Sequence, residues 1–154
     1  MKKIIKAILV IICMISIFSF SEDTGVESTK KSDTVILGVS EIFGFDYLSK
    51  KEQRFIIDTF VVPVRKSAHF IIYFILGLLL ISFFKEFSYP IKKLIFLSIF
   101  LAFLYAVSDE VHQLFVLGRS GRVVDIFIDT LGASTGVFIY TLIFRKRLRE
   151  SYHE

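Results

Sequence analysis

The sequence is poor in cysteine and in charged residues. Its 154 residues include one cysteine, so no internal disulfide can hold the fold together. Only 22% of the residues are charged and 54% are hydrophobic, which is the opposite of a disordered composition. A soluble domain of this size needs a polar surface over its core, so the composition also argues against that class. It favours a small membrane protein with several spans.

Four apolar runs predict four membrane-spanning helices. They cover residues 4–20, 67–84, 94–107 and 123–144. A spanning helix needs about 20 residues, and the third run is clearly shorter than that. We therefore expect its helix to continue through Asp109, Glu110 and Gln113. Ionisable side chains would then lie inside the boundary of the membrane.

The fold class predicted from these runs is all-α, a polytopic helical bundle with about four transmembrane helices. Lys and Arg accumulate on the cytoplasmic side of membrane proteins. With the N-terminus inside, the cytoplasmic segments hold ten of the 19 basic residues but only three of the 15 acidic ones. Both termini are thus predicted to be cytoplasmic. This asymmetry accounts for the net charge of +4, and no motif for nucleic acid is present.

Composition divides the chain into four segments. Residues 1–21 are an N-terminal transmembrane anchor, residues 22–64 a long extracytoplasmic loop with room for amphipathic helices, residues 65–144 a transmembrane core, and residues 145–154 a basic cytoplasmic tail. Helices in the loop would lie on the membrane surface or pack against the bundle. The first span also partly fits a cleaved signal peptide, but its apolar run is longer than usual, which favours an anchor.

Ionisable residues converge at one end of three predicted helices. Ionisable groups inside a membrane are costly and each suggests a functional site. The arginines of the turn before the last helix can bind carboxylates or phosphates with their planar guanidinium groups. Further along that helix, Gly132 and Gly136 would let another helix approach closely. The converging residues are Lys66, His69, Tyr73, Asp109, Glu110, His112, Gln113, Asp125 and Asp129, with Arg119 and Arg122 in the turn.

The same residues form an ordered set that resembles the VanZ-like membrane proteins. The set reads Lys66-Ser-Ala-His69-Phe70, Asp109-Glu110-x-His112-Gln113, Gly118-Arg119 and Asp125-x-x-x-Asp129-Thr-Leu-Gly132-x-x-x-Gly136. The resemblance implies a protein of the Gram-positive cell envelope that is linked to glycopeptide antibiotics, above all to low-level teicoplanin resistance. It implies no particular reaction, because the molecular activity of the family is not settled.

Three interpretations of the polar residues stay open. In the first, Lys66 and the arginines pair with the carboxylates and only fasten the helices together. In the second, these cations bind membrane lipids, through an anionic headgroup or a lipid-linked cell-wall precursor. In the third, His112 is a base oriented by Asp109, with Glu110 beside it, in a hydrolase or transferase acting on a lipid headgroup.

The residues expected to bind a ligand are Lys66, His69, Tyr73, Gln113, Arg119, Arg122, Asp125 and Asp129, and those expected to act in catalysis are His112, Asp109 and Glu110. Histidines and carboxylates also suit a divalent metal. The sequence does not decide whether the protein is an enzyme, and it specifies neither a cofactor, a metal nor an oligomeric state.

Overall fold

The computed structural model describes residues 2–42, 44 and 47–153, and the side chains of that set as far as Phe144. The fold is all-α, with 87% of the chain in helices and no strand among the described residues. The elements are α1 (Lys2–Glu22), α2 (Gly25–Ile42), α3 (Lys50–Phe84), a short 3-10 helix η1 (Lys85–Phe87), α4 (Ile91–Gln113) and α5 (Val123–His153). The predicted fold class is thereby confirmed as all-helical.

Four of these helices are long and apolar enough to cross a membrane: α1, α3, α4 and the part of α5 at Val123–Phe144. Because α4 ends at Gln113, the short third run does continue into its polar end, as its length predicted. The second helix differs from the expectation, since α3 begins at Lys50 rather than near residue 67. Ser49 and Glu52 form a capping box at its start, and such a box fixes a helix N-terminus without any apolar residue.

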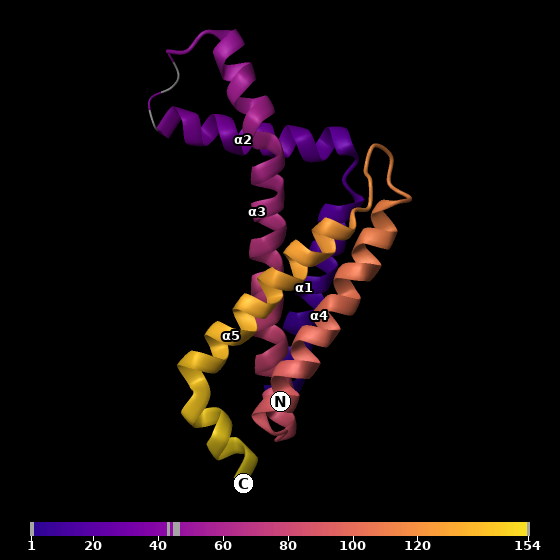
Figure 1. The fold of residues 1–154 in the computed structure, drawn as a ribbon, viewed down its shortest axis with the longest axis vertical. Coiled ribbons are helices and arrows are strands. Elements are labelled where there is room, and N and C mark those ends of the chain that lie inside the picture. Colours follow the sequence, from indigo (N-terminus) through magenta and orange to yellow (C-terminus); the bar gives the residue numbers. More distant parts are fainter. Residues whose placement is uncertain (1, 43, 45–46, 154) are drawn as a thin grey trace.

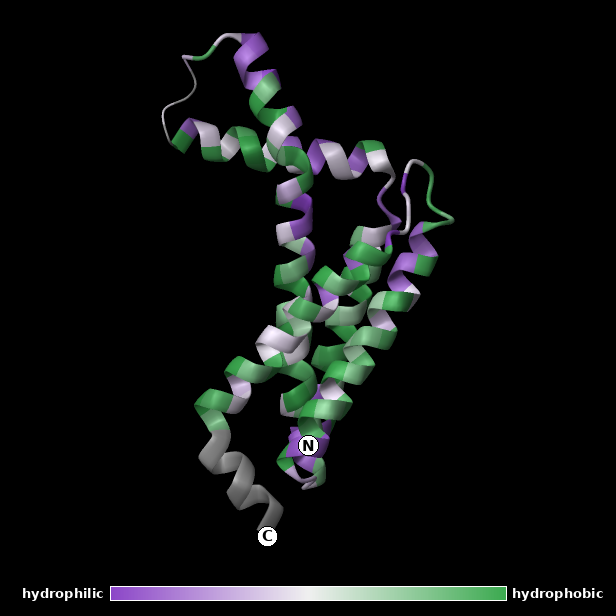
Figure 2. Ribbon diagram, viewed as in Figure 1, coloured by the Kyte–Doolittle hydropathy of each residue, from purple (hydrophilic) through white to green (hydrophobic). Residues whose placement is uncertain are grey.

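The four helices form an upright bundle with both termini at the same end, and α2 with the first turns of α3 stands beyond the other end (Figure 1). Apolar residues cover the bundle between two polar ends (Figure 2). Large side chains such as Ile11, Ile15, Phe127 and Leu142 are more than half exposed. A water-soluble bundle would bury such groups. The chain is therefore a multi-pass membrane protein.

The segment before the core contains α2 and the first four turns of α3, so the boundary expected after residue 64 falls inside one continuous helix. Ile36 of α2 and Ile57 of α3 are buried where these two helices pack together. Val35, Val39 and Ile42 of α2 are exposed. The helices expected in this segment are thus present. Their position relative to the membrane surface stays a prediction.

Helices α3 and α5 approach each other more closely than side chains would permit. A Cβ atom on Gly132 would lie 2.4 Å from the Phe70 carbonyl oxygen, and one on Gly136 would lie 2.2 Å from that of Phe74. From the other side, a Cβ on Gly77 would lie 2.1 Å from the carbonyl oxygen of Ala133. The close helix contact expected at Gly132 and Gly136 is confirmed, and it places the polar ends of α3 and α5 against each other.

Replacing Gly136 by alanine tests this contact. We expect Gly136→Ala to lower the stability of the detergent-solubilised protein by about 1–3 kcal/mol, because the added methyl group overpacks a backbone contact. Gly38→Ala in α2 is the matched control, since a Cβ there would meet no atom of the described residues within 4 Å. It should leave stability unchanged or raise it by up to about 1 kcal/mol. Equal melting temperatures for the two variants would contradict the close contact.

Candidate functional site

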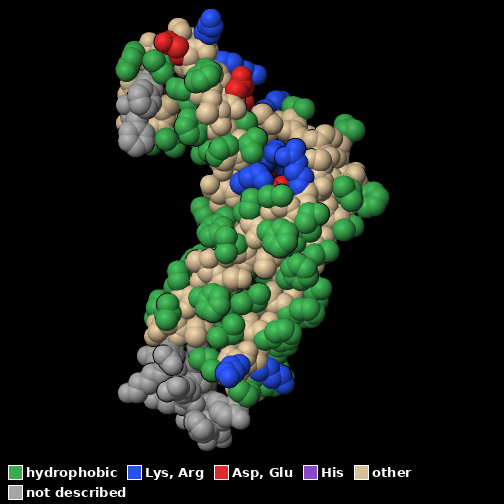
Figure 3. Space-filling view, in the orientation of Figure 1, with side chains coloured by type: hydrophobic (Ala, Val, Ile, Leu, Met, Phe, Trp, Pro, Cys, Tyr) green, Lys and Arg blue, Asp and Glu red, His purple; other side chains and the backbone are tan. Residues whose placement is uncertain are grey.

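A polar cavity of about 140 Å³ lies at the end of the bundle where the turn between α4 and α5 is found. Basic side chains gather there around a small acidic surface, in the upper part of the bundle (Figure 3). Helices α3, α4 and α5 and the turn all contribute to its wall. The cavity is lined by Arg65, Lys66, His69, Glu110, Gln113, Gly118, Arg119, Ser120, Arg122, Asp125, Ile128 and Asp129.

Two acid–base pairs join α3 to α5 in the wall of the cavity. The Lys66 ammonium donates to the Asp125 carboxylate, and about a quarter of each side chain is exposed. One turn deeper, His69 Nδ1 lies 3.7 Å from Asp129 Oδ1. The two pairs follow from the register of α3 and α5, which run in the same direction and cross each other obliquely (Figure 1).

The polar end of α4 forms a hydrogen-bonded network behind the cavity. Glu110 Oε2 accepts from the Arg122 backbone N–H at 2.7 Å, which fixes the end of the turn. Gln113 Nε2 donates to Glu110 Oε1 at 3.2 Å and contacts Asp109 Oδ2 and Ser21 Oγ, each at 3.4 Å. Glu110 therefore has a positioning role for the turn, and Gln113 connects α4 to α1.

Arg119 fastens the turn to the end of α1. Its Nε donates to the Asp23 carbonyl oxygen at 2.9 Å, and its Nη2 donates to that of Phe20 at 2.8 Å. Gly25 N also donates to the Leu117 carbonyl oxygen at 3.1 Å. Burial lowers the pKa of the Arg119 guanidinium from its ordinary value, but a guanidinium stays charged in proteins. Sequence reasoning expected the arginines of the turn to bind either carboxylates or phosphates. Arg119 instead binds backbone carbonyls, and it also lines the cavity.

Most of the residues expected to bind a ligand lie together. Lys66, His69, Gln113, Arg119, Arg122, Asp125 and Asp129 line the cavity, and so does Glu110 from the set expected to act in catalysis. Arg65, Ser120 and Ile128 line it as well. Arg65 was not among the residues expected to bind a ligand. Its position next to Lys66, just before the apolar run, could have indicated that it lies at the same site.

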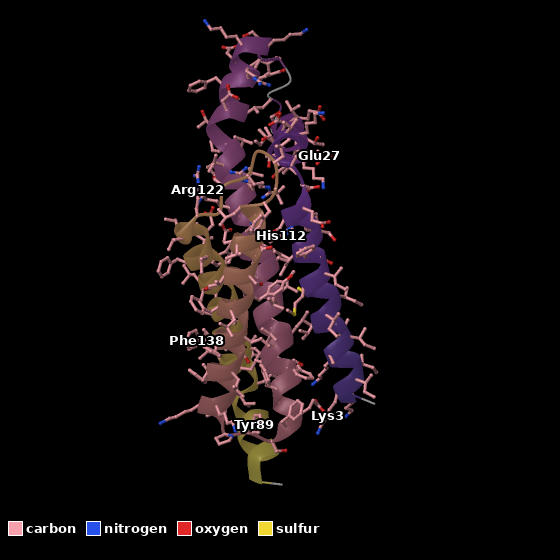
Figure 4. All side chains as sticks on the ribbon, turned by 90° about the vertical axis from the view of Figure 1, so that its right-hand side faces the viewer. Lys3, Glu27, Tyr89, His112, Arg122 and Phe138 are labelled. Atoms are coloured by element: carbon pink, nitrogen blue, oxygen red, sulfur yellow. The ribbon has the colours of Figure 1, made fainter. Side chains whose placement is uncertain are left out.

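Tyr73, Asp109 and His112 do not line the cavity. Tyr73 is fully buried deeper in the bundle, with its ring 6.3 Å from that of Tyr105. Asp109 is also buried. The His112 ring stacks on Phe18 of α1 with the ring centroids 4.2 Å apart. Figure 4 places His112 at the same end of the bundle as Arg122 and Glu27, far from Lys3 and Tyr89.

A second cavity, of about 260 Å³ and mainly apolar, adjoins the first between α1, α2 and α3. Arg65, His69 and Arg119 line both cavities. The apolar part of the wall consists of Ile17, Phe20, Val35, Val64, Ala68 and Ile72. Sequence reasoning missed this cavity, because nothing in the local pattern shows that α1 and α2 lie beside the start of the core.

Comparison with protein families gives a match to VanZ/LLP1 over residues 6–145. The chain belongs to the VanZ/LLP1 family. The match extends beyond the motifs of residues 65–136 to α1 and α2, which are the helices that complete the apolar cavity. No curated protein and no solved structure matches the chain. The geometry of this VanZ-family site therefore has to be interpreted from its own residues.

Exchanging Arg119 for lysine tests the fastening of the turn. Arg119→Lys keeps the charge but loses the fork that reaches two carbonyls. We expect faster hydrogen exchange in residues 116–122 of this variant. Arg122→Lys is the matched control, because among the described residues the Arg122 side chain donates only to Ser120 Oγ, within its own turn. Identical exchange in the two variants would contradict a fastening role for Arg119.

Proposed function

We propose that this VanZ-family protein binds an anionic lipid, either a membrane lipid or a lipid-linked cell-wall precursor, at the outer face of the bacterial plasma membrane, and thereby lowers susceptibility to teicoplanin. The observation that carries the proposal is the pair of adjoining cavities. One is polar and is lined by basic side chains together with the carboxylates of Glu110, Asp125 and Asp129, and the other is apolar. The two cavities have Arg65, His69 and Arg119 in common. An amphiphile with a charged headgroup has the same two parts.

The polar cavity offers guanidinium groups for a phosphate or carboxylate. Among the described residues, no carboxylate lies within ion-pair distance of Arg65 or Arg122. Lys66, by contrast, is already neutralised by Asp125. Arginine binds phosphate oxygens with two parallel hydrogen bonds, and basic pockets between transmembrane helices suit lipid headgroups. Arg65 and Arg122 are thus the proposed main headgroup ligands, and Arg119 faces the same space although its Nε and Nη2 already bind carbonyl oxygens.

The second cavity is mainly apolar, as a binding site for a hydrocarbon chain must be. Its apolar wall comes from three helices, and its polar lining residues include Asp23 and, from α2, Lys31, which form an ion pair with each other. Burying a methylene group is worth about 0.8 kcal/mol. Even a short stretch of acyl or prenyl chain would therefore add substantially to the binding of a headgroup.

Charge asymmetry supports an outer location for the site. Both termini lie at the end of the bundle opposite the cavities (Figure 1). The basic residues of the sequence favour that end as cytoplasmic. The cavities would then face the outer leaflet, where cell-wall precursors are used.

The structure favours a lipid-binding role over a catalytic role in which His112 acts as the base. A general base must reach the proton that it removes, and His112 stacks on Phe18 outside the lining of the polar cavity. The purely structural interpretation leaves the two spare guanidinium groups at the cavity without a role.

Teicoplanin susceptibility tests the biological part of the proposal. Expression of the wild-type protein in a susceptible host should raise the inhibitory concentration above that of an empty vector. The double variant Arg65→Gln/Arg122→Gln should abolish most of the increase. Arg54→Gln is the control, because Arg54 is an exposed residue of α3 away from both cavities. If the wild type gives the same inhibitory concentration as the empty vector, the protein has no role in resistance. If the double variant raises the inhibitory concentration as much as the wild type does, the cavity is not the site responsible.

Lipid binding is tested by native mass spectrometry of the purified protein. We expect phosphatidylglycerol to bind at least about tenfold more tightly than phosphatidylcholine, a difference of about 1.4 kcal/mol. Arg65→Gln/Arg122→Gln should remove this preference, and Arg54→Gln should keep it. Inorganic phosphate, added as a competitor, distinguishes a site for the phosphate alone from one that also needs the chain. No preference for the anionic lipid in the wild type would contradict the proposal.

A further inference from the structure

Two carboxylates are buried beside the polar cavity without adequate partners. Asp129 is 0% exposed and Asp109 is 2% exposed. Neither oxygen of Asp129 has a hydrogen-bond partner among the described residues, and neither does Asp109 Oδ1. Buried carboxylates are very costly unless a counter-charge or hydrogen bonds compensate them. A further cation would satisfy these atoms.

The basic residues of the site are engaged elsewhere or are too distant to supply that cation. Lys66 is paired with Asp125, and the Arg119 guanidinium donates to the carbonyls of Phe20 and Asp23. Among the described residues, only His69 lies within ion-pair distance of Asp129, at 3.7 Å, and this is too long for a hydrogen bond. Within the described part of the chain, the fully buried Tyr73 hydroxyl also has no hydrogen-bond partner.

His69 and the two buried carboxylates lie close to one another. One ligand atom each of His69, Asp109 and Asp129 lies within 4.8 Å of the others. Ligand atoms held at about 2.1 Å from a common ion are at most about 4.2 Å apart. The three side chains come from α3, α4 and α5, so small rotations about their side-chain bonds would bring them to coordination distance.

We propose that His69, Asp109 and Asp129 bind a divalent transition-metal ion. One imidazole nitrogen and two carboxylate oxygens form a donor set suited to Zn²⁺ or Mn²⁺. The ion neutralises the two buried carboxylates and connects three helices at the inner side of the polar cavity. Because His69 and Asp129 also line that cavity, a remaining coordination position faces the space for an anionic group. The metal site does not depend on the proposed function, since the ion binds without lipid.

Metal analysis of the purified protein in detergent tests the proposal. After treatment with a chelator, the protein is incubated with Zn²⁺ or Mn²⁺ alone and freed of unbound ion. We expect close to one ion per wild-type chain. Asp109→Asn and Asp129→Asn should each weaken binding at least tenfold, whereas Asp58→Asn should bind as the wild type does. Asp58 is an exposed carboxylate of α3 outside the cluster, and the same change there controls for charge.

The visible absorption spectrum of bound Co²⁺ provides a second test, which uses the wild-type protein and so does not depend on whether the variants fold. Co²⁺ bound through an imidazole and two carboxylates should give the wild-type protein a visible spectrum that Zn²⁺ displaces. Absence of bound ion and of this spectrum in the wild type would overturn the proposal. So would retention of the ion by folded Asp109→Asn and Asp129→Asn proteins. Because lipid is not added, these outcomes are separate from success or failure of the lipid-binding experiment.

Discussion

The site depends on one constraint, the close contact between α3 and α5, in which glycines of one helix meet backbone carbonyls of the other. Where Gly132 and Gly136 meet the carbonyls of Phe70 and Phe74, the two parallel helices have a fixed register. One and two turns above this contact, the same register sets His69 opposite Asp129 and Lys66 opposite Asp125. Larger side chains at the glycine positions would separate the helices and with them the charges. In a membrane, such packing replaces the hydrophobic driving force that joins helices in water.

The second feature that shapes the site is the end of α4. This helix carries Asp109, Glu110 and Gln113 into the bundle because its apolar run is too short to span the membrane alone. Glu110 fixes the backbone of the following turn through Arg122, and Arg119 of that turn holds the carbonyls at the end of α1. The polar groups thus connect four helices at one end. The cost of placing them there is offset only in part, since Asp109 and Asp129 have oxygens with no hydrogen-bond partner in the described part of the chain.

The sequence predicted those parts of the fold that depend on local patterns. Hydropathy and length were enough to predict the four spans and the continuation of α4 to Gln113. The spacing of Gly132 and Gly136 was enough to predict a close helix contact. The start of α3 at Lys50 was missed because its first five residues are polar and Asp58 interrupts the apolar residues that follow them. The Ser49–Glu52 capping box was the local signal that marked this start.

Long-range contacts of the site could not be predicted in the same way. Arg119 binds backbone carbonyls of Phe20 and Asp23, and a carbonyl acceptor has no signature in the sequence. His112 lies three residues after Asp109 and was expected to share its face. Successive residues of a helix are rotated by about 100°, so His112 is displaced by about 60° around the helix axis from Asp109. This displacement turns the His112 ring toward Phe18 of α1. The apolar cavity depends on how α1 and α2 pack beside α3, which no local pattern determines.

The central claim is that charges from separate helices meet in a cavity at the exterior end of the bundle. Cysteine labelling in intact cells tests it most directly, in a background in which the buried Cys13 is replaced by alanine. Ser120→Cys lies in the turn beside the cavity, and Lys92→Cys lies at the opposite end, in the first turn of α4. The account predicts that a membrane-impermeant maleimide labels Ser120→Cys in intact cells and labels Lys92→Cys only after permeabilisation. The reverse pattern would contradict it.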